Sequence, residues 1–164
     1  IRRNIYMQKL NPLLHQLDQE LHRYLAFDNT KKVHEHLLEY DEESVSDIIP
    51  KISVTDLDII SRIANCHEIR IKELVDTVYF PQGTVSKIVN RLVKKELIRK
   101  YHRSDNKKDV YLKLTANGQI IAKLHEKYHE KENKKLNELG TNFSNSDLQK
   151  LTEILRKINE LREN

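Results

Sequence analysis

Two histidines four residues apart are the side chains of this sequence best placed to bind a metal. His125 and His129 lie in the run KLHEKYHEKE, and on a helix they would project from one face. Two imidazoles placed in this way can bind one Zn²⁺, which accepts nitrogen and oxygen ligands. Candidates to complete such a site are His34, His36, Glu39 and Asp41. The alternative is a solvated polar helix face that binds nothing.

The sequence contains no arrangement typical of a catalytic centre. Cys66 stands beside His67, but adjacent side chains on a helix do not face each other, and no third orienting group is indicated. The three glycines do not form a phosphate-binding loop. We therefore expect a protein that is not an enzyme and requires no cofactor. Cys66 is interpreted as a small packing residue rather than a redox sensor.

Positive charge is concentrated in one segment of the chain. Residues 78–113 contain ten Lys or Arg and three Asp or Glu, a net charge of +7, whereas the whole chain carries only +4. Such a concentration is the electrostatic footprint of a protein that replaces counterions on nucleic-acid phosphates. The segment predicts binding to double-stranded DNA. A solvated basic face without a partner is the competing interpretation.

Two predicted elements of this segment carry the candidate DNA contacts. A helix over 81–95 would turn its polar face away from its apolar stripe, and a helix of this width fits the major groove. The contacts expected from this helix are Gln82, Gly83, Thr84, Ser86, Lys87, Asn90 and Arg91, with Gly83 allowing close backbone approach. A charged hairpin tip follows, where Arg103, Lys107 and Lys108 would contact a neighbouring groove or phosphates.

The elements that must position these residues are mostly helices. Apolar residues recur every three or four positions over 5–40, which predicts one long helix, and shorter helices are predicted over 54–65 and 71–78. After Lys95 the period changes to two, which predicts strands over 97–103 and 110–114. Two more helices are predicted, one from Thr115 to about Gly140 and one from Ser146, whose spacing to Gln149 fits a capping box.

An acidic stretch separates the first helix from the next. Between Glu39 and Asp58 there are seven acidic residues and one lysine, which indicates a solvated loop. Thr55 is the predicted N-cap of the helix that follows. The single cysteine, the lack of an apolar run long enough to span a bilayer and the absence of a signal-type start predict a soluble, cytoplasmic protein with no membrane partner.

The run GTVSKIVNRLVKKELI followed by SDNKKDVYLKLTANG resembles the MarR family of winged helix-turn-helix transcription regulators. The order of the flanking helices is similar as well, so the resemblance covers nearly the whole chain. It implies a mainly α fold with a small two- or three-stranded β wing. Three regions follow: an N-terminal dimerisation helix and acidic linker (1–52), a winged helix-turn-helix DNA-binding domain (53–114) and C-terminal dimerisation helices (115–164).

The resemblance also implies a function, with two departures from the family pattern. Members form homodimers on pseudo-palindromic operators, usually repress, and often release DNA when a small ligand, oxidant or metal binds. Here Glu96 replaces the common glycine after the recognition helix, and Asn106, Lys107 and Lys108 occupy the positions of the Asp-x-Arg pattern of the wing. Lysine keeps the charge but loses the planar fork of arginine.

Two alternative functions remain open. The zinc-responsive branch of the family has a histidine pair at the positions of His125 and His129, and its further histidine falls on Asp58, a different ligand. The resemblance therefore leaves a zinc-responsive regulator as one alternative, with Zn²⁺ as the effector. The alternative of another class is a helical adaptor that binds RNA or protein through its basic face.

Overall fold

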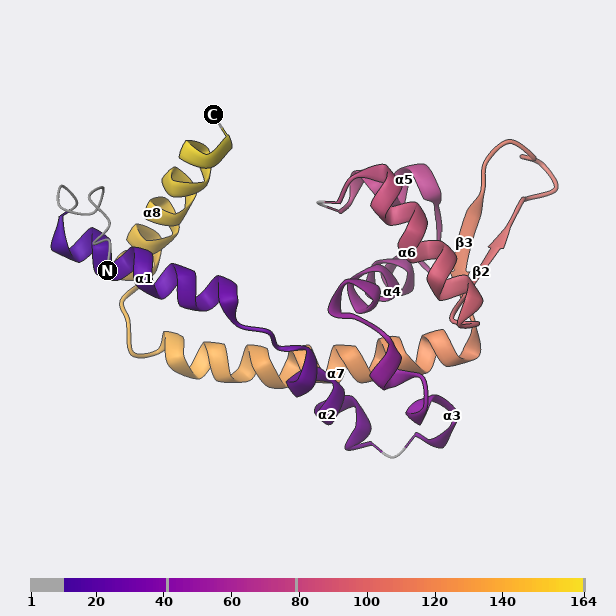
Figure 1. Ribbon diagram of the computed structural model, residues 1–164, viewed down its shortest axis with the longest axis horizontal. Helices are drawn as coiled ribbons and strands as arrows, with labels where there is room; N and C mark the ends of the chain where they lie inside the picture. The colour runs from indigo at the N-terminus through magenta and orange to yellow at the C-terminus, as the bar shows by residue number, and fades with distance from the viewer. Residues whose placement is uncertain (1–10, 41, 79, 164) are drawn as a thin grey trace, which may run out of the picture.

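The computed structural model describes residues 11–40, 42–78 and 80–163 and consists of a compact lobe seated on one long helix (Figure 1). In chain order the elements are α1 (Pro12–Ala26), α2 (Thr30–Leu38), α3 (Glu43–Ser46), the 3₁₀ turn η2 (Ile49–Lys51), α4 (Val54–Cys66), β1 (Glu68–Arg70), α5 (Ile71–Asp76), α6 (Gln82–Lys94), β2 (Ile98–Tyr101), β3 (Tyr111–Leu114), α7 (Ala116–Gly140) and α8 (Asn145–Glu163). The lobe holds α4 to β3. Helices α1 and α8 lie at the end of α7 that is farther from the wing. Along the described residues, no helix combines the length and apolar character of a membrane span.

The strands form one antiparallel sheet in the order β1-β3-β2. Strands β2 and β3 pair from Ile98 with Leu114 to Tyr101 with Tyr111, which confirms the predicted hairpin. The wing was predicted to have two or three strands, and β1 is the third, at a position that was not predicted; it adds Ile69 opposite Leu112. Three residues are too few to show an alternating pattern, which explains why β1 was missed. The sheet confirms the mainly α fold with a small β wing.

The core of the lobe lies where α4, α6 and the sheet meet α7. Each of these elements contributes fully or almost fully buried apolar side chains: Leu57, Ile60 and Ile63 from α4, Val85, Val89 and Leu92 from α6, Leu112 from β3, and Ile121 and Leu124 from α7. The apolar stripe predicted for the helix over 81–95 is therefore the face that α6 buries. Helices α1 and α8 bury no side chain among their described residues.

The long helix predicted over 5–40 is wrong, because the chain breaks between α1 and α2. Asn11 caps the start of α1 and Pro12 is its first residue; residues 5–10 of the prediction lie outside the described part. The break falls at residues 27–29, where the Asp28 carboxylate accepts a hydrogen bond from the Thr30 amide. Asp and Asn favour such local bonds over continued helix, which periodicity alone does not register.

Two predicted helix starts are also wrong. The N-cap of α4 is Ser53 rather than Thr55, and Asp56 completes a capping box with it. At the start of α8, Ser144 and Asp147 exchange the corresponding hydrogen bonds in place of Ser146 and Gln149. The acidic stretch that was predicted to be a solvated loop also contains α3 and η2, and Asp56 within it is buried.

Helix α6 ends with an unusual backbone conformation. Glu96 has φ 57°, the left-handed region in which glycine is usual. The Leu97 amide donates to the Leu92 carbonyl (3.0 Å) and the Glu96 amide to the Val93 carbonyl (3.0 Å), so the helix closes with a Schellman motif. The helix therefore ends in the conformation that is usual for a C-terminal glycine, although a glutamate occupies the position.

Candidate nucleic-acid interface

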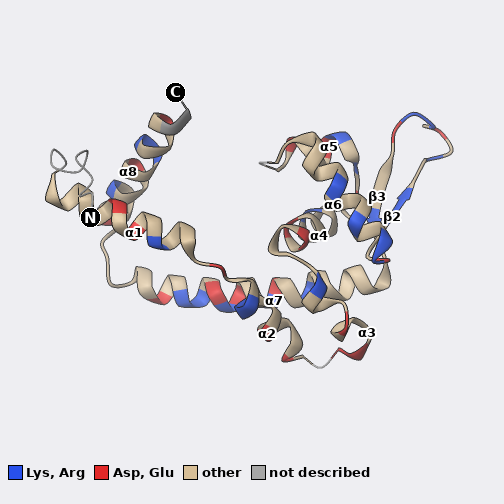
Figure 2. Cartoon of the chain, in the orientation of Figure 1, with Lys and Arg blue, Asp and Glu red and all other residues tan. Residues whose placement is uncertain are grey.

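Helix α6 and the wing carry the concentrated positive charge of the lobe (Figure 2). Gln82, Gly83, Thr84 and Lys87 of α6 are exposed, and Ser86 is half-buried. An added Cβ at Gly83 would meet nothing within 4 Å, so no packing among the described residues requires the glycine. Among the described residues, Lys87 has no ion-pair partner. The first two turns of α6 thus offer polar groups to a ligand outside the chain.

Arg91 is paired with a buried carboxylate of the lobe, although its own side chain stays partly exposed. Its Nη2 and Nε donate to Asp56 Oδ1 at 2.5 and 3.1 Å, and the Asp56 side chain is only 1% exposed. Asp56 Oδ2 accepts from the Ser53 amide at 2.8 Å. This pair fixes α6 against the start of α4. The DNA contact predicted for Arg91 stays a prediction, and the structure adds a partner from another helix to its guanidinium.

Asn90 and Arg103 also have partners within the chain. Asn90 Oδ1 accepts a hydrogen bond from Lys100 Nζ of β2. Arg103 pairs with Glu68 of β1, and its guanidinium lies 4.3 Å from the centre of the Tyr111 ring. Asn90 therefore joins α6 to β2, and Arg103 joins the wing loop to β1. These partners were missed because they are distant in sequence and give no local signal.

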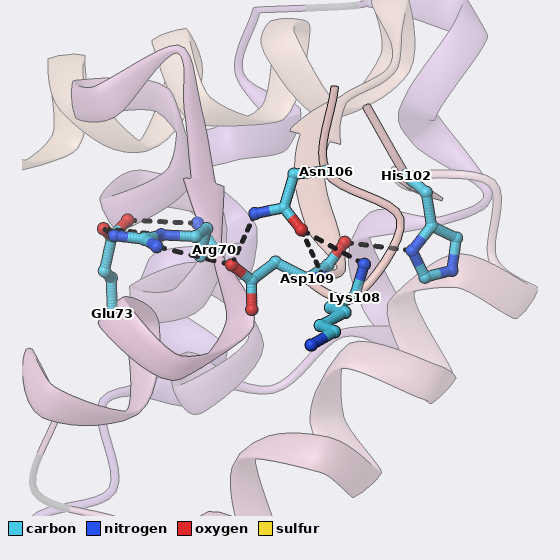
Figure 3. Close-up of polar contacts among 6 residues, drawn as sticks. All are labelled: Arg70, Glu73, His102, Asn106, Lys108 and Asp109. Carbon is cyan, nitrogen blue, oxygen red and sulfur yellow. Dashed lines mark hydrogen bonds and ion pairs between the residues drawn. The ribbon is translucent and has the colours of Figure 1, made fainter. Parts of the chain in front are cut away.

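The tip of the wing is a turn closed by hydrogen bonds between Asn106, Lys108 and Asp109 (Figure 3). Asn106 Oδ1 accepts from the amides of Lys108 and Asp109, both at 3.1 Å. Asp109 Oδ2 in turn accepts from Asn106 Nδ2 at 2.8 Å and from Arg70 Nη1 at 3.4 Å. Lys107 and Lys108 are exposed and, within the described residues, neither has an ion-pair partner. Sequence reasoning singled out the lysines but not Arg70 or Asp109.

The predicted histidine pair does come together, on the opposite side of the lobe core. The rings of His125 and His129 are 4.3 Å apart between centroids. His125 is 2% exposed, and its Nδ1 hydrogen-bonds Ser61 Oγ at 2.9 Å, whereas His129 is exposed. Burial, and then the nearby His129, lower the pKa of His125 to about 4. His125 is thus neutral at physiological pH, as a metal ligand must be.

The other predicted metal ligands are not assembled around this pair. Burial raises the pKa of Asp58, and nearby Arg62 and His129 partly offset that rise. His34 Nε2 bonds the Ile52 carbonyl, and His36 is buried against Glu39. Asp41 lies outside the described residues. Within the described ranges, no three His, Cys, Asp or Glu side chains form a group that could hold a metal ion.

A pocket lies between α4, β3 and α7, beside His129. Its volume is about 780 Å³, and its polar lining includes Ser61, Asn65, Gln119, Lys123 and Glu126. Cys66 does not line it; the thiol is exposed at the end of α4, so its interpretation as a packing residue is wrong. The pocket spans the junction between the lobe and the long helix.

Known proteins share both the sequence pattern and the fold. The MarR family model matches residues 52–110. The HTH-type transcriptional regulator PchR of Bacillus subtilis is 26% identical over 151 residues, covering 91% of this chain and 89% of PchR. Lactococcus lactis ZitR, described as a zinc-responsive MarR family member, superposes with a TM-score of 0.67 at 24% identity, covering 90% of this chain and 97% of ZitR. Streptococcus pneumoniae FabT in complex with DNA superposes with a TM-score of 0.59 at 20% identity, covering 88% of this chain and 96% of FabT.

These matches agree with the geometry of the lobe. The family model covers the segment from the approach to α4 to the end of the wing loop, just before β3, which contains the helix-turn-helix and most of the concentrated charge. The family consists of transcription regulators rather than enzymes. With the motif, the winged helix and the relatives in agreement, residues 52–110 match the MarR family, and the chain as a whole is similar in sequence to HTH-type transcriptional regulators and in fold to MarR-family proteins.

Proposed function

We propose that this chain is a homodimeric repressor that places α6 in successive major grooves of a pseudo-palindromic operator and its wings on the adjoining grooves. The main support for this proposal is that three exposed lysines have no ion-pair partner in the described chain: Lys87 on α6, and Lys107 and Lys108 on the wing. These lysines are free to displace counterions from phosphates. Gln82, Thr84 and Ser86, near the start of α6, are the candidates for base edges and phosphates.

The roles of the other predicted contacts follow from their partners. Arg91 and Arg103 retain exposed edges, with side chains 44% and 43% exposed, so each can approach a phosphate while its pair holds it in place. Asn90 is tied to Lys100 in the same way. Gly83 leaves the backbone open to close approach. We assign base reading to the start of α6 and phosphate anchoring to the remaining basic groups.

A second copy of the chain is proposed to cover α1, the end of α7 and α8. These elements expose large apolar side chains that no part of the described lobe covers: Leu13, Leu14, Tyr24, Leu25, Leu136, Leu139, Leu148, Leu151, Ile154 and Leu161. Apolar faces of this extent on a water-exposed protein indicate an interaction surface. Sedimentation equilibrium should give a dimer, and replacing Leu151 and Ile154 with glutamate should give a monomer with weakened operator binding.

The DNA-binding experiment compares specific and unspecific duplexes across salt concentrations. An operator is first selected from random duplexes with the purified protein, and anisotropy then measures its affinity beside that of a scrambled duplex. We expect tighter binding to the operator and a linear fall of log affinity with log salt. Lys87→Ala should weaken binding and flatten that slope, whereas Lys134→Ala, which removes an exposed charge from α7, should not.

Three results would contradict this function or the placement of α6. Equal affinity for operator and scrambled duplex at every salt concentration would remove sequence-specific regulation. Tighter binding to single-stranded RNA or to a protein than to any duplex would instead favour the helical adaptor. An unchanged affinity in the double variant Lys87→Ala, Arg91→Ala would show that α6 is misplaced.

We propose that the effector is a small molecule that binds the pocket between α4, β3 and α7. The pocket joins the DNA-binding lobe to the helix that leads to the proposed dimer region, so a ligand there can shift one relative to the other. A ligand that binds the DNA-binding arrangement of the lobe and the other arrangement with different affinities shifts the balance between them. The affinity for the operator then changes by at most the ratio of those two ligand affinities. The test is a screen for compounds that alter operator affinity, with Gln119→Leu as the pocket variant.

Zinc is the second candidate effector, and the contact between His125 and His129 favours it. A third ligand is not supplied by the described arrangement, and Asp58 is the residue proposed for it. Titrating Zn²⁺ into the wild type and into the double variant His125→Ala, His129→Ala, while following operator affinity, decides the matter. An identical response in the two proteins would remove these histidines.

A further inference from the structure

Two arginine–carboxylate ion pairs join the wing loop to strand β1, one at each end of the loop. On the outgoing side, Arg103 pairs with Glu68 at the start of β1. On the returning side, Asp109 pairs with Arg70 at the end of β1. Strand β1 lies beside β3, on the edge away from β2. Between these two ties only residues 104–108 project, so the wing tip is short and its base is fixed.

The returning tie is a four-residue network rather than a single contact (Figure 3). Arg70 donates from Nε to Glu73 Oε1 at 2.8 Å and from Nη1 to Asp109 Oδ2 at 3.4 Å, so one guanidinium joins two carboxylates. The bond from Asn106 and then the Arg70 guanidinium lower the pKa of Asp109, which keeps the carboxylate charged. Since Arg70 is also the N-cap residue of α5, the wing is joined directly to the helix-turn-helix.

Asn106 fits this network better than the aspartate usual at its position. Its amide oxygen accepts two backbone amides, as an aspartate oxygen would. Its Nδ2 also donates to Asp109 Oδ2 at 2.8 Å, which a carboxylate cannot do. An aspartate at 106 would instead place two carboxylates side by side. Asn106 and Asp109 therefore form a matched pair.

We propose that Asp109 is a positioning residue for DNA binding, which, through Arg70 and Asn106, holds the wing turn so that Lys107 and Lys108 face the duplex. This inference rests on the proposed function. The turn is already closed in the free protein, so less conformational freedom is lost when the lysines meet phosphates. Asp109 thus strengthens binding to a polyanion although it carries a negative charge itself.

The test is whether removing the negative charge of Asp109 weakens operator binding rather than strengthening it. Asp105, in the same loop, provides a control variant with the same change in charge. Asp109→Asn and Asp105→Asn each remove one negative charge from the wing, but within the described residues Asp105 makes no hydrogen bond or ion pair. Simple electrostatics predicts tighter operator binding for both variants. We expect Asp109→Asn to bind about three- to tenfold more weakly and its salt slope to fall by about one, while Asp105→Asn binds as tightly as wild type or more tightly.

Two further variants separate positioning from folding. Arg70→Lys keeps the charge but loses the fork that reaches both carboxylates, and Asn106→Ala removes the turn acceptor without changing charge. Both should weaken operator binding while thermal unfolding stays at the wild-type midpoint. Combining Arg70→Lys with Asp109→Asn should weaken binding by less than the product of the single effects, because both break one network.

The outcomes distinguish this inference from the proposed function. A wild-type protein that treats operator and scrambled duplex alike overturns the proposed function, and the inference with it, before any variant is made. A wild type that binds specifically, together with an Asp109→Asn protein that binds as tightly as Asp105→Asn, overturns the positioning role alone.

Discussion

Replacing Arg91 with alanine should destabilise the fold, whereas replacing Lys87 four residues earlier on the same helix should not. Arg91 donates two hydrogen bonds to Asp56, whose side chain is 1% exposed. Lys87 is exposed and no ion pair is assigned to it in the described chain. Both side chains are basic and both were predicted to contact DNA, so their difference depends on the tertiary contact alone.

The magnitude follows from what remains around Asp56. Without Arg91 the buried carboxylate keeps one hydrogen bond, from the Ser53 amide. Removing one partner of a fully buried ion pair costs about 3–5 kcal/mol. Arg91 is 44% exposed, so water reaches this side of the pair and we expect a loss nearer about 2–3 kcal/mol. Lys87→Ala, an exposed change, should stay within about 0.5 kcal/mol of wild type.

The assay is urea unfolding at one fixed protomer concentration, because dimerisation makes apparent stability depend on concentration. Arg91→Lys is the matched control: it keeps the charge, loses the two-pronged contact and should give an intermediate loss. The same proteins are then compared for operator affinity across salt concentrations. Lys87→Ala should flatten the salt slope by about one.

An Arg91→Ala protein that unfolds at the wild-type midpoint would refute the structural role of the Asp56 pair. If Arg91→Ala and Lys87→Ala lowered the salt slope equally with no change in stability, Arg91 would be a DNA contact without a role in holding the lobe together.

Three further predictions concern residues of α7 and the end of α6. Gly118→Ala should destabilise the lobe by about 1–3 kcal/mol in urea unfolding, because its Cβ would lie 2.2 Å from the Leu97 carbonyl oxygen; unchanged stability would contradict this close approach. Glu96→Gly should raise stability by about 0.5–1 kcal/mol by relieving the left-handed conformation, and a loss would show that the conformation is not strained. Stability should fall as pH drops from 6.5 toward 4, since the pKa of His125 is lowered from 6.5 to about 4 in the folded state and the unfolded chain binds the proton first. The full loss is about 3 kcal/mol, and His125→Asn should flatten this part of the pH profile.

Local sequence patterns determined the order of elements and the location of the charge. Apolar periodicity depends on neighbouring residues, so the faces buried by α4 and α6 and the hairpin of β2 and β3 were predictable. The concentration of Lys and Arg over 78–113 needs only counting, and it marks the wing and α6. The break before α2 and strand β1 were not predictable in this way, because local side-chain bonds and pairing with a distant strand decided them.

Tertiary structure decided which basic residues are available to a ligand. Lys87, Lys107 and Lys108 remain unpaired within the described chain, whereas Arg91 is held by Asp56 and Arg103 by Glu68. Each of these partners lies some 35 residues away along the chain, and an ion pair at that separation leaves no periodic signal. The sequence by itself determined that this protein carries a basic helix and wing. Only the fold, by bringing distant carboxylates against particular arginines, divided those cations into arginines that also hold the lobe together and lysines that have no partner within the described chain.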